Sequence, residues 1–214
     1  MENYFFMPRV LGWLSRPRHF NRLLSFTLRA LAVLVVPFSL VTFFKAGKVI
    51  FDLPASGILG GIFFEMFFMV AIYCVVHVLF IRARDIDALP GTEYNIFPLG
   101  GILARATGET LAAFVGLVAV GGGIFVWFTG KGVGTILSPP PKFMPLFGDT
   151  TFMGGIEFMV GGVLSAILIL LLSTLTAEGL RLLTEAAART SEARPMSKSE
   201  VSEPSLKLRS GTGY

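Results

Sequence analysis

The stretch from Gly57 to Ile81, GILGGIFFEMFFMVAIYCVVHVLFI, decides the class of this protein. Its only acidic residue is Glu65, and it contains neither lysine nor arginine. A helix of about 20 mostly apolar residues crosses the roughly 30 Å of hydrocarbon in a bilayer. The stretch is therefore predicted to be a transmembrane helix, because exposing so long an apolar run to water is unfavourable.

The composition of the whole chain agrees with a membrane protein. Hydrophobic residues make up 53% of the 214 residues and charged residues only 15%, with a mean hydropathy of +0.72. Soluble domains carry about a quarter charged residues. We therefore predict an all-α membrane protein with four transmembrane helices, at residues 24–44, 57–81, 109–128 and 155–177. Pro37 is expected to kink the first helix.

The distribution of lysine and arginine predicts the orientation in the membrane. Most basic residues precede the first span, join the second to the third, or follow the fourth. The two remaining loops carry only Lys45, Lys48, Lys131 and Lys142. Cytoplasmic loops carry the excess of positive charge. Both termini are therefore predicted to be cytoplasmic, and the compact chain with its strong bias favours a bacterial inner membrane.

The chain is expected to consist of three regions. Residues 1–23 mix aromatic and basic side chains and should form an interfacial arm among the lipid headgroups. Residues 24–189 form the transmembrane domain, and residues 190–214 should be a disordered cytoplasmic tail. The outer loop, residues 129–154, is rich in glycine and proline. It is expected to cap the helix ends, with a binding role as the alternative.

A faint internal repeat divides the transmembrane domain in two. Arg29 and Arg105, each followed by alanine, precede the first and third apolar helices. A Gly-Gly-Ile triplet opens the second helix at Gly60 and the fourth at Gly154. The pattern indicates two tandem helical hairpins related by an axis along the membrane normal. Chance is the alternative, because such pairs are common in membrane helices.

Ionisable residues inside a membrane are costly, so they are candidate functional residues. Glu65 and Glu157 lie near the outer ends of their helices. Either lysines and helix N-termini neutralise them, or they bind a cation or proton. Glu109 is expected to open the third helix and to form an ion pair with Arg105 on the same face or elsewhere in the bundle. His77 is expected to hydrogen-bond to a neighbouring helix, with a proton relay to Glu109 as the alternative.

Small residues at helical spacing predict where helices pack closely. Gly57 and Gly61 form one such pair, Gly116 belongs to another, and Gly161 with Ser165 forms a third. Small residues let helix backbones approach one another. The pattern does not choose between packing within the chain and packing against another subunit.

Four phenylalanines surround the second predicted helix, which suggests contact with lipid or with a partner subunit. They are Phe63, Phe64, Phe67 and Phe68.

Several classes of function lack support in the sequence. With one cysteine, Cys74, and two histidines, the chain cannot build a disulfide or a Cys/His metal cage. No catalytic motif or cofactor motif is present, and the basic residues suit lipid headgroups better than nucleic acid. Asp85 and Asp87 are expected to form surface ion pairs with the neighbouring Arg82 and Arg84, with contact to a divalent cation as the alternative.

The sequence therefore favours a non-enzymatic role in assembly. We expect an accessory or scaffold subunit of a membrane complex, or one member of a homo-oligomer, with a membrane protein or a second copy as partner. The alternative is a small oligomeric ion or proton channel or transporter that uses the intramembrane glutamates. A sensor of the outer leaflet, working through the proline-rich loop, is a third possibility.

Overall fold

The computed structural model describes residues 17–90, 96–136 and 150–192. Most of the expected interfacial arm, most of the outer loop and nearly all of the expected tail lie outside these residues. The described chain forms four long helices, α2 (Pro17–Phe51), α3 (Ala55–Asp87), α4 (Ile96–Thr129) and α5 (Phe152–Glu192), and a short 3-10 helix, η2 (Val133–Thr135). These described residues include no strand, and all four long helices are apolar enough to cross a membrane. The predicted fold class is confirmed.

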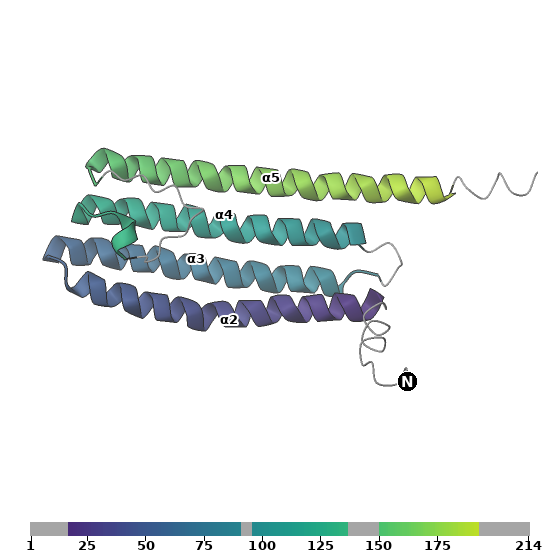
Figure 1. Ribbon diagram of the computed structural model, residues 1–214, viewed down its shortest axis with the longest axis horizontal. Helices are drawn as coiled ribbons and strands as arrows, with labels where there is room; N and C mark the ends of the chain where they lie inside the picture. Colours follow the sequence, from purple (N-terminus) through teal and green to yellow (C-terminus); the bar gives the residue numbers. More distant parts are fainter. Residues whose placement is uncertain (1–16, 91–95, 137–149, 193–214) are drawn as a thin grey trace, which may run out of the picture.

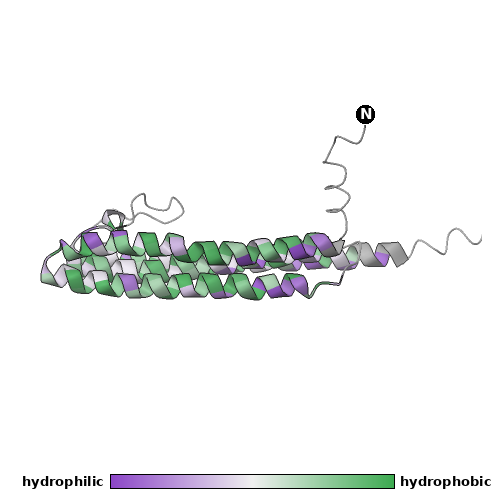
Figure 2. Cartoon of the chain, turned by 90° about the horizontal axis from the view of Figure 1, so that it is seen from below, coloured by the Kyte–Doolittle hydropathy of each residue, from purple (hydrophilic) through white to green (hydrophobic). Residues whose placement is uncertain are grey.

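The four helices lie side by side in chain order (Figure 1). α2 packs on α3, α3 on α4, and α4 on α5, while other pairs of long helices make at most marginal contact. Seen from the edge, the array is thin (Figure 2). The chain therefore forms an open layer of helices, in which α2 and α5 are the edges and each has one extensive neighbour.

The helices extend further than predicted at the end where the α3–α4 connection lies. α4 begins at Ile96, so the prediction that Glu109 opens this helix is wrong, and Glu109 lies well inside it. The extra turns are held by packing, because Leu99 and Ala106 are buried against neighbouring helices. The predicted span was shorter because it was based on an uninterrupted apolar run, and Arg105 and Glu109 interrupt that run.

α2 runs unbroken through Pro37. Proline removes one backbone hydrogen bond from a helix and crowds the preceding turn, which bends it. α2 bows near its middle (Figure 1), and the Ser39 hydroxyl donates to the carbonyl oxygen of Val36 at 2.8 Å. This hydrogen bond does not replace the one that Pro37 removes, because the carbonyl oxygen freed by a proline belongs to the residue four positions earlier, here Val33.

The phenylalanines of α3 mostly pack inside the chain rather than around the helix. Phe64 and Phe68 are buried, and their rings meet Phe125 and Phe114 of α4. Phe63 stacks on Phe128, with ring centroids 6.3 Å apart. The prediction that these aromatics face lipid or a partner on all sides is wrong, because α4 covers one side of α3.

The small residues serve contacts within the chain. A Cβ atom added at Gly61 would lie 2.4 Å from a methyl carbon of Ile50, and one at Gly57 would lie 2.9 Å from Leu53. A Cβ atom at Gly116 would meet Ala166 at 3.3 Å. Dispersion between closely approaching backbones therefore stabilises the helix layer itself.

The Gly161 and Ser165 pair makes a local contact along α5. The Ser165 hydroxyl donates to the carbonyl oxygen of Gly161 at 2.7 Å. On the same helix, a Cβ atom at Gly162 would lie 2.1 Å from the Cβ atom of Ala119. The close approach of α5 to α4 therefore depends on Gly162.

Apolar side chains cover the outside of the layer along most of its length (Figure 2). Phe38, Tyr73 and Leu164 are among many large side chains that are more than half exposed. Such a surface is stable against lipid and not against water. The chain is therefore a multi-pass membrane protein, and its orientation remains the prediction made from the lysines and arginines.

Candidate functional site at the charged end of the layer

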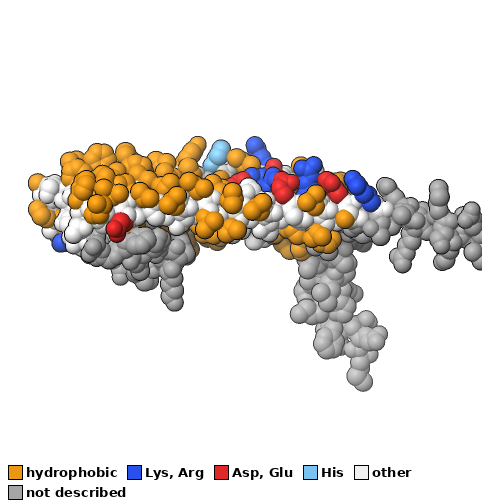
Figure 3. Space-filling view, turned by 90° about the horizontal axis from the view of Figure 1, so that it is seen from above, with side chains coloured by type: hydrophobic (Ala, Val, Ile, Leu, Met, Phe, Trp, Pro, Cys, Tyr) orange, Lys and Arg blue, Asp and Glu red, His pale blue; other side chains and the backbone are white. Residues whose placement is uncertain are grey.

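Charged side chains gather at the end of the layer where α3 ends and α4 begins, which we call the charged end (Figure 3). In α4, residues 110–129 contain no charged side chain, and in α5 the same holds for residues 158–177. Glu109 and Glu178 follow immediately at the charged end. The surface therefore changes from apolar to ionic over one helical turn, as expected where hydrocarbon gives way to lipid headgroups.

Arg82 of α3 stands at this boundary. Its Nε donates to Glu109 Oε2 of α4 at 2.9 Å, and its Nη2 also contacts Glu109 Oε1. Its Nη1 donates to Asp85 Oδ2 at 2.8 Å. One guanidinium thus holds two carboxylates, and a bidentate arrangement of this kind is directional and charge-assisted.

Further ion pairs link the remaining helices at the same end. Arg29 of α2 contacts Asp87 of α3, and Arg105 of α4 contacts Glu178 of α5. Two pairings were expected for Glu109, one with Arg105 on its own helix and one elsewhere in the bundle. The structure shows the second, a pair with Arg82 of α3. Asp85 pairs with the neighbouring Arg82 as expected, whereas Asp87 pairs with Arg29 of α2.

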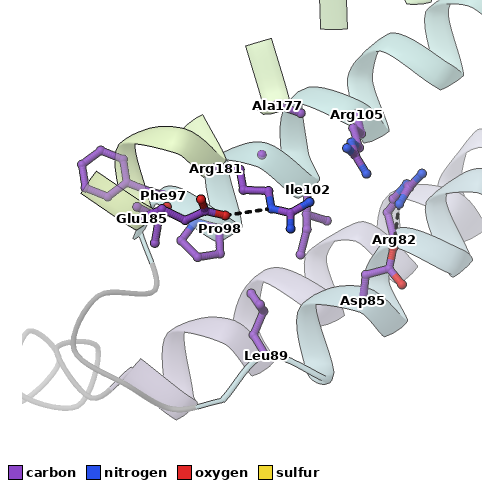
Figure 4. Close-up of a pocket in the computed structure, with 12 residues that line it drawn as sticks. Arg82, Asp85, Leu89, Phe97, Pro98, Ile102, Arg105, Ala177, Arg181 and Glu185 are labelled. Carbon is purple, nitrogen blue, oxygen red and sulfur yellow. Dashed lines mark hydrogen bonds and ion pairs between the residues drawn. The ribbon is translucent and has the colours of Figure 1, made fainter. Parts of the chain in front are cut away.

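A cavity of about 540 Å³ lies among these pairs. α4 contributes Phe97, Pro98, Gly101, Ile102 and Arg105, and the other lining residues come from the facing parts of α3 and α5 and from Leu89, just after α3. Arg82 and Arg105 lie on one side of the cavity and Phe97 and Pro98 on the other (Figure 4). The cavity is therefore mostly apolar, with charged groups placed at a few points, as is typical of small-molecule sites.

Arg181 and Glu185 of α5 also line this cavity. Arg181 Nε lies 3.4 Å from Glu185 Oε1, and its Nη1 lies 4.0 Å from Glu178 Oε2. Figure 4 shows the Arg181 side chain reaching between the two sides of the cavity. Both members of this pair are more than half exposed, so water screens their attraction.

A second cavity, of about 530 Å³, lies between the beginning of α2 and the end of α3. It is lined by Asn21, Ser25, Arg29 and Asp87 among others. Asn21 and Ser25 are buried, and the Ser25 hydroxyl has no hydrogen-bond partner among the described residues. This cavity is more polar than the first and opens at the same end.

The four ionisable residues singled out by sequence do not form one site. Glu109 lies at the charged end, whereas Glu65 and Glu157 lie near the opposite ends of α3 and α5. His77 is exposed and stacks on Tyr73, with ring centroids 5.8 Å apart. The expected relay from His77 to Glu109 gains no support from these contacts, because Glu109 is held by Arg82.

Glu65 has the more unusual surroundings of the two outer glutamates. Its Oε1 atom is buried and lacks a hydrogen-bond partner among the described residues. A Cβ atom added at Gly47 of α2 would lie 3.2 Å from this oxygen. Glu65 therefore faces the backbone of α2, where glycine leaves room for its carboxyl group, while Glu157 is exposed.

Sequence reasoning named Glu109 but missed the cavity and the role of Arg181. Local spacing carried part of the signal, because Arg82 with Asp85, and Arg181 with Glu178 and Glu185, lie three or four residues apart. The cavity itself requires α3 and α5 to flank α4, which no local pattern specifies.

Within residues 17–90, 96–136 and 150–192, no group of three or more His, Cys, Asp or Glu side chains is placed to hold a metal ion. The charged end presents arginine and carboxylate side chains. No protein-family model, curated protein or solved structure matches this chain significantly.

Proposed function

We propose that this protein is an assembly component of the membrane, either an accessory or scaffold subunit of a membrane complex or one member of a homo-oligomer. The observation that carries the proposal is the open helix layer, in which each long helix packs chiefly on its neighbours in the chain. Such a layer leaves two edge helices able to receive another membrane helix.

The layer also argues against a transport path built by one chain. A path enclosed by four helices would require the layer to close, with α2 packed on α5. These two helices make at most marginal contact. Transport would therefore require several chains, so assembly comes first in either case.

The edge formed by α5 has the pattern of a helix-packing seam. Leu164, Leu168, Leu171 and Leu175 are each more than half exposed, and they recur at alternating spacings of four and three residues. Apolar residues at this spacing keep one face of a helix toward a partner helix. We propose this face as the surface through which the chain assembles.

The mass of the purified protein in mild detergent tests the proposal. Light scattering and native mass spectrometry are expected to give a dimer, a higher oligomer or a stoichiometric hetero-complex. Alanine at Leu168 and Leu171 is expected to weaken that complex. Alanine at Met66 and Met69, which are exposed on α3, is the matched control and should leave it intact. A monomer without a partner would refute the proposal.

An oligomeric ion or proton channel is the second candidate, favoured by the buried Oε1 of Glu65, which has no hydrogen-bond partner among the described residues. Its test is flux into vesicles for the Glu65→Gln and Glu157→Gln variants. If flux occurs in the wild type and is lost in the Glu65 variant, the channel is supported. Flux that survives both substitutions would exclude the glutamates from its path.

A further inference from the structure

The cavity among Arg82, Arg105 and Arg181 lies at the level where the apolar surface of α4 and α5 ends. Arg105 precedes the charge-free residues 110–129 of α4 by little more than one turn, and Ala177 ends the charge-free residues 158–177 of α5. About 20 residues of helix cross the hydrocarbon. The arginines are therefore placed at the level of lipid phosphates, and the rest of the cavity lies in the headgroup region beyond.

The lining of this cavity is both basic and acidic. Asp85 and Glu185 line it together with the three arginines, and Glu109 and Glu178 pair with Arg82 and Arg105 from just outside it. The local charge is thus close to balanced. A ligand carrying only negative charge would meet these carboxylates, whereas a ligand with both signs of charge can satisfy both sets of groups.

The remaining lining suits the uncharged parts of such a ligand. Leu89 of the α3 end, Phe97, Pro98 and Ile102 of α4 and Ala177 of α5 form apolar walls. Gly101 has no side chain and leaves space beside α4. The cavity therefore combines apolar walls with a few charged groups next to the bilayer.

We propose that this cavity binds the headgroup of a phospholipid that carries a phosphate and a primary ammonium group, that is, a phosphoethanolamine headgroup. Guanidinium groups of Arg105 and Arg181 bind the phosphate, because their planar donors match its oxygens. Glu185, which lies beside Arg181, accepts hydrogen bonds from the ammonium group. Basic pockets between transmembrane helices commonly receive lipid headgroups in this way.

Native mass spectrometry of the delipidated protein tests the proposal. The protein is titrated with phosphatidylethanolamine, phosphatidylcholine and phosphatidylglycerol that have identical acyl chains. Phosphatidylethanolamine is expected to be retained best, because only its headgroup offers both a phosphate and N–H donors. Equal retention of the three lipids, or retention of none, would overturn the proposal, and this comparison requires no variant.

Variants then assign the charged groups. Arg105→Gln and Arg181→Gln are each expected to weaken retention of phosphatidylethanolamine by about fivefold, since one arginine near a lipid surface contributes about 1 kcal/mol. Arg84→Gln and Arg189→Gln are matched controls, because both arginines are exposed and neither lines the cavity. If the controls weaken retention equally, the site is not in this cavity.

The acidic half of the site has its own signature. Glu185→Gln is expected to remove the preference for phosphatidylethanolamine over phosphatidylglycerol, because the ammonium group loses its acceptor. An unchanged preference would overturn the assignment of this carboxylate.

The source of the phosphate is tested with glycerophosphoethanolamine, which has the same headgroup without acyl chains. At equal concentration it is expected to compete poorly, because it cannot place acyl chains against the apolar surface below the cavity. Competition as effective as that of the lipid would show a site for a soluble phosphate ester and would overturn the lipid assignment.

Discussion

Arg82 of α3 and Glu109 of α4 form an ion pair that joins the two helical hairpins, α2–α3 and α4–α5. The pair of Arg29 and Asp87 lies inside the first hairpin, α2–α3. The pair of Arg105 with Glu178 lies inside the second, α4–α5. Arg29 and Arg105, which the predicted repeat places at corresponding positions, each pair with the second helix of their own hairpin, while Arg82 links one hairpin to the other.

Removing one partner of this link is expected to destabilise the protein. Side chains of Arg82 and Glu109 are only 19% and 27% exposed, so Glu109→Gln leaves a guanidinium poorly compensated. We expect a loss of about 2 kcal/mol in the free energy of unfolding, between the values for exposed and buried pairs. Thermal or denaturant unfolding in detergent measures it.

A control and a second variant interpret that loss. Arg84→Gln, at an exposed position on the same helix, is expected to change stability by less than about 0.5 kcal/mol. The double variant Arg82→Met with Glu109→Leu should lose less than Glu109→Gln alone, because neither charge of the pair is left behind and Asp85, whose side chain is 40% exposed, is solvated by water. If the double variant loses as much free energy of unfolding as Glu109→Gln alone, or more, the two charges are not coupled.

Side chains at Gly162 are expected to separate α4 from α5. A Cβ atom there would lie 2.1 Å from that of Ala119, so Gly162→Val should cost about 2 kcal/mol or more through overpacking. Gly179→Ala is the matched control on the same helix, since its Cβ atom would meet nothing within 4 Å. That change should stabilise α5 by about 0.5 kcal/mol or more through helix propensity. The expectation fails if both variants shift the unfolding midpoint in the same direction.

Trp127 joins the end of α4 to the beginning of α5. Its Nε1 donates to the carbonyl oxygen of Phe152 at 2.8 Å, and its ring stacks on Phe152 with centroids 5.0 Å apart. Trp127→Phe retains an aromatic ring but removes the donor, so it should cost about 1 kcal/mol. Trp127→Leu should cost more, because the stacking is also lost. Equal unfolding midpoints for the two variants would show that stacking contributes nothing.

Thiol labelling in intact cells tests the orientation predicted from the lysines and arginines. On a Cys74→Ala background, Lys131→Cys is expected to react with an impermeant maleimide from outside. Arg189→Cys should react only after the membrane is permeabilised. Both positions are exposed in the structure, so access depends on the membrane side. The reverse pattern would invert the topology.

The helix spans were predictable from sequence, and their ends less so. Apolar runs such as residues 57–81 identify a span because charged residues inside hydrocarbon are costly. The helix turns that precede Glu109 are interrupted by the charged Arg105 and escaped this criterion, although packing of Leu99 and Ala106 makes them part of α4. Similarly, the sequence showed that the phenylalanines of α3 are apolar, but it did not show on which side of α3 the helix α4 packs.

The sequence by itself determined that this is an all-α membrane protein with four spans, because that follows from the length and apolarity of separate segments. Only the tertiary structure decided which groups meet. Arg105 and Glu109 are four residues apart, yet they pair with α5 and α3 respectively. The physical reason is that α4 lies between these two helices, and a carboxylate placed by a neighbouring helix competes with one supplied locally.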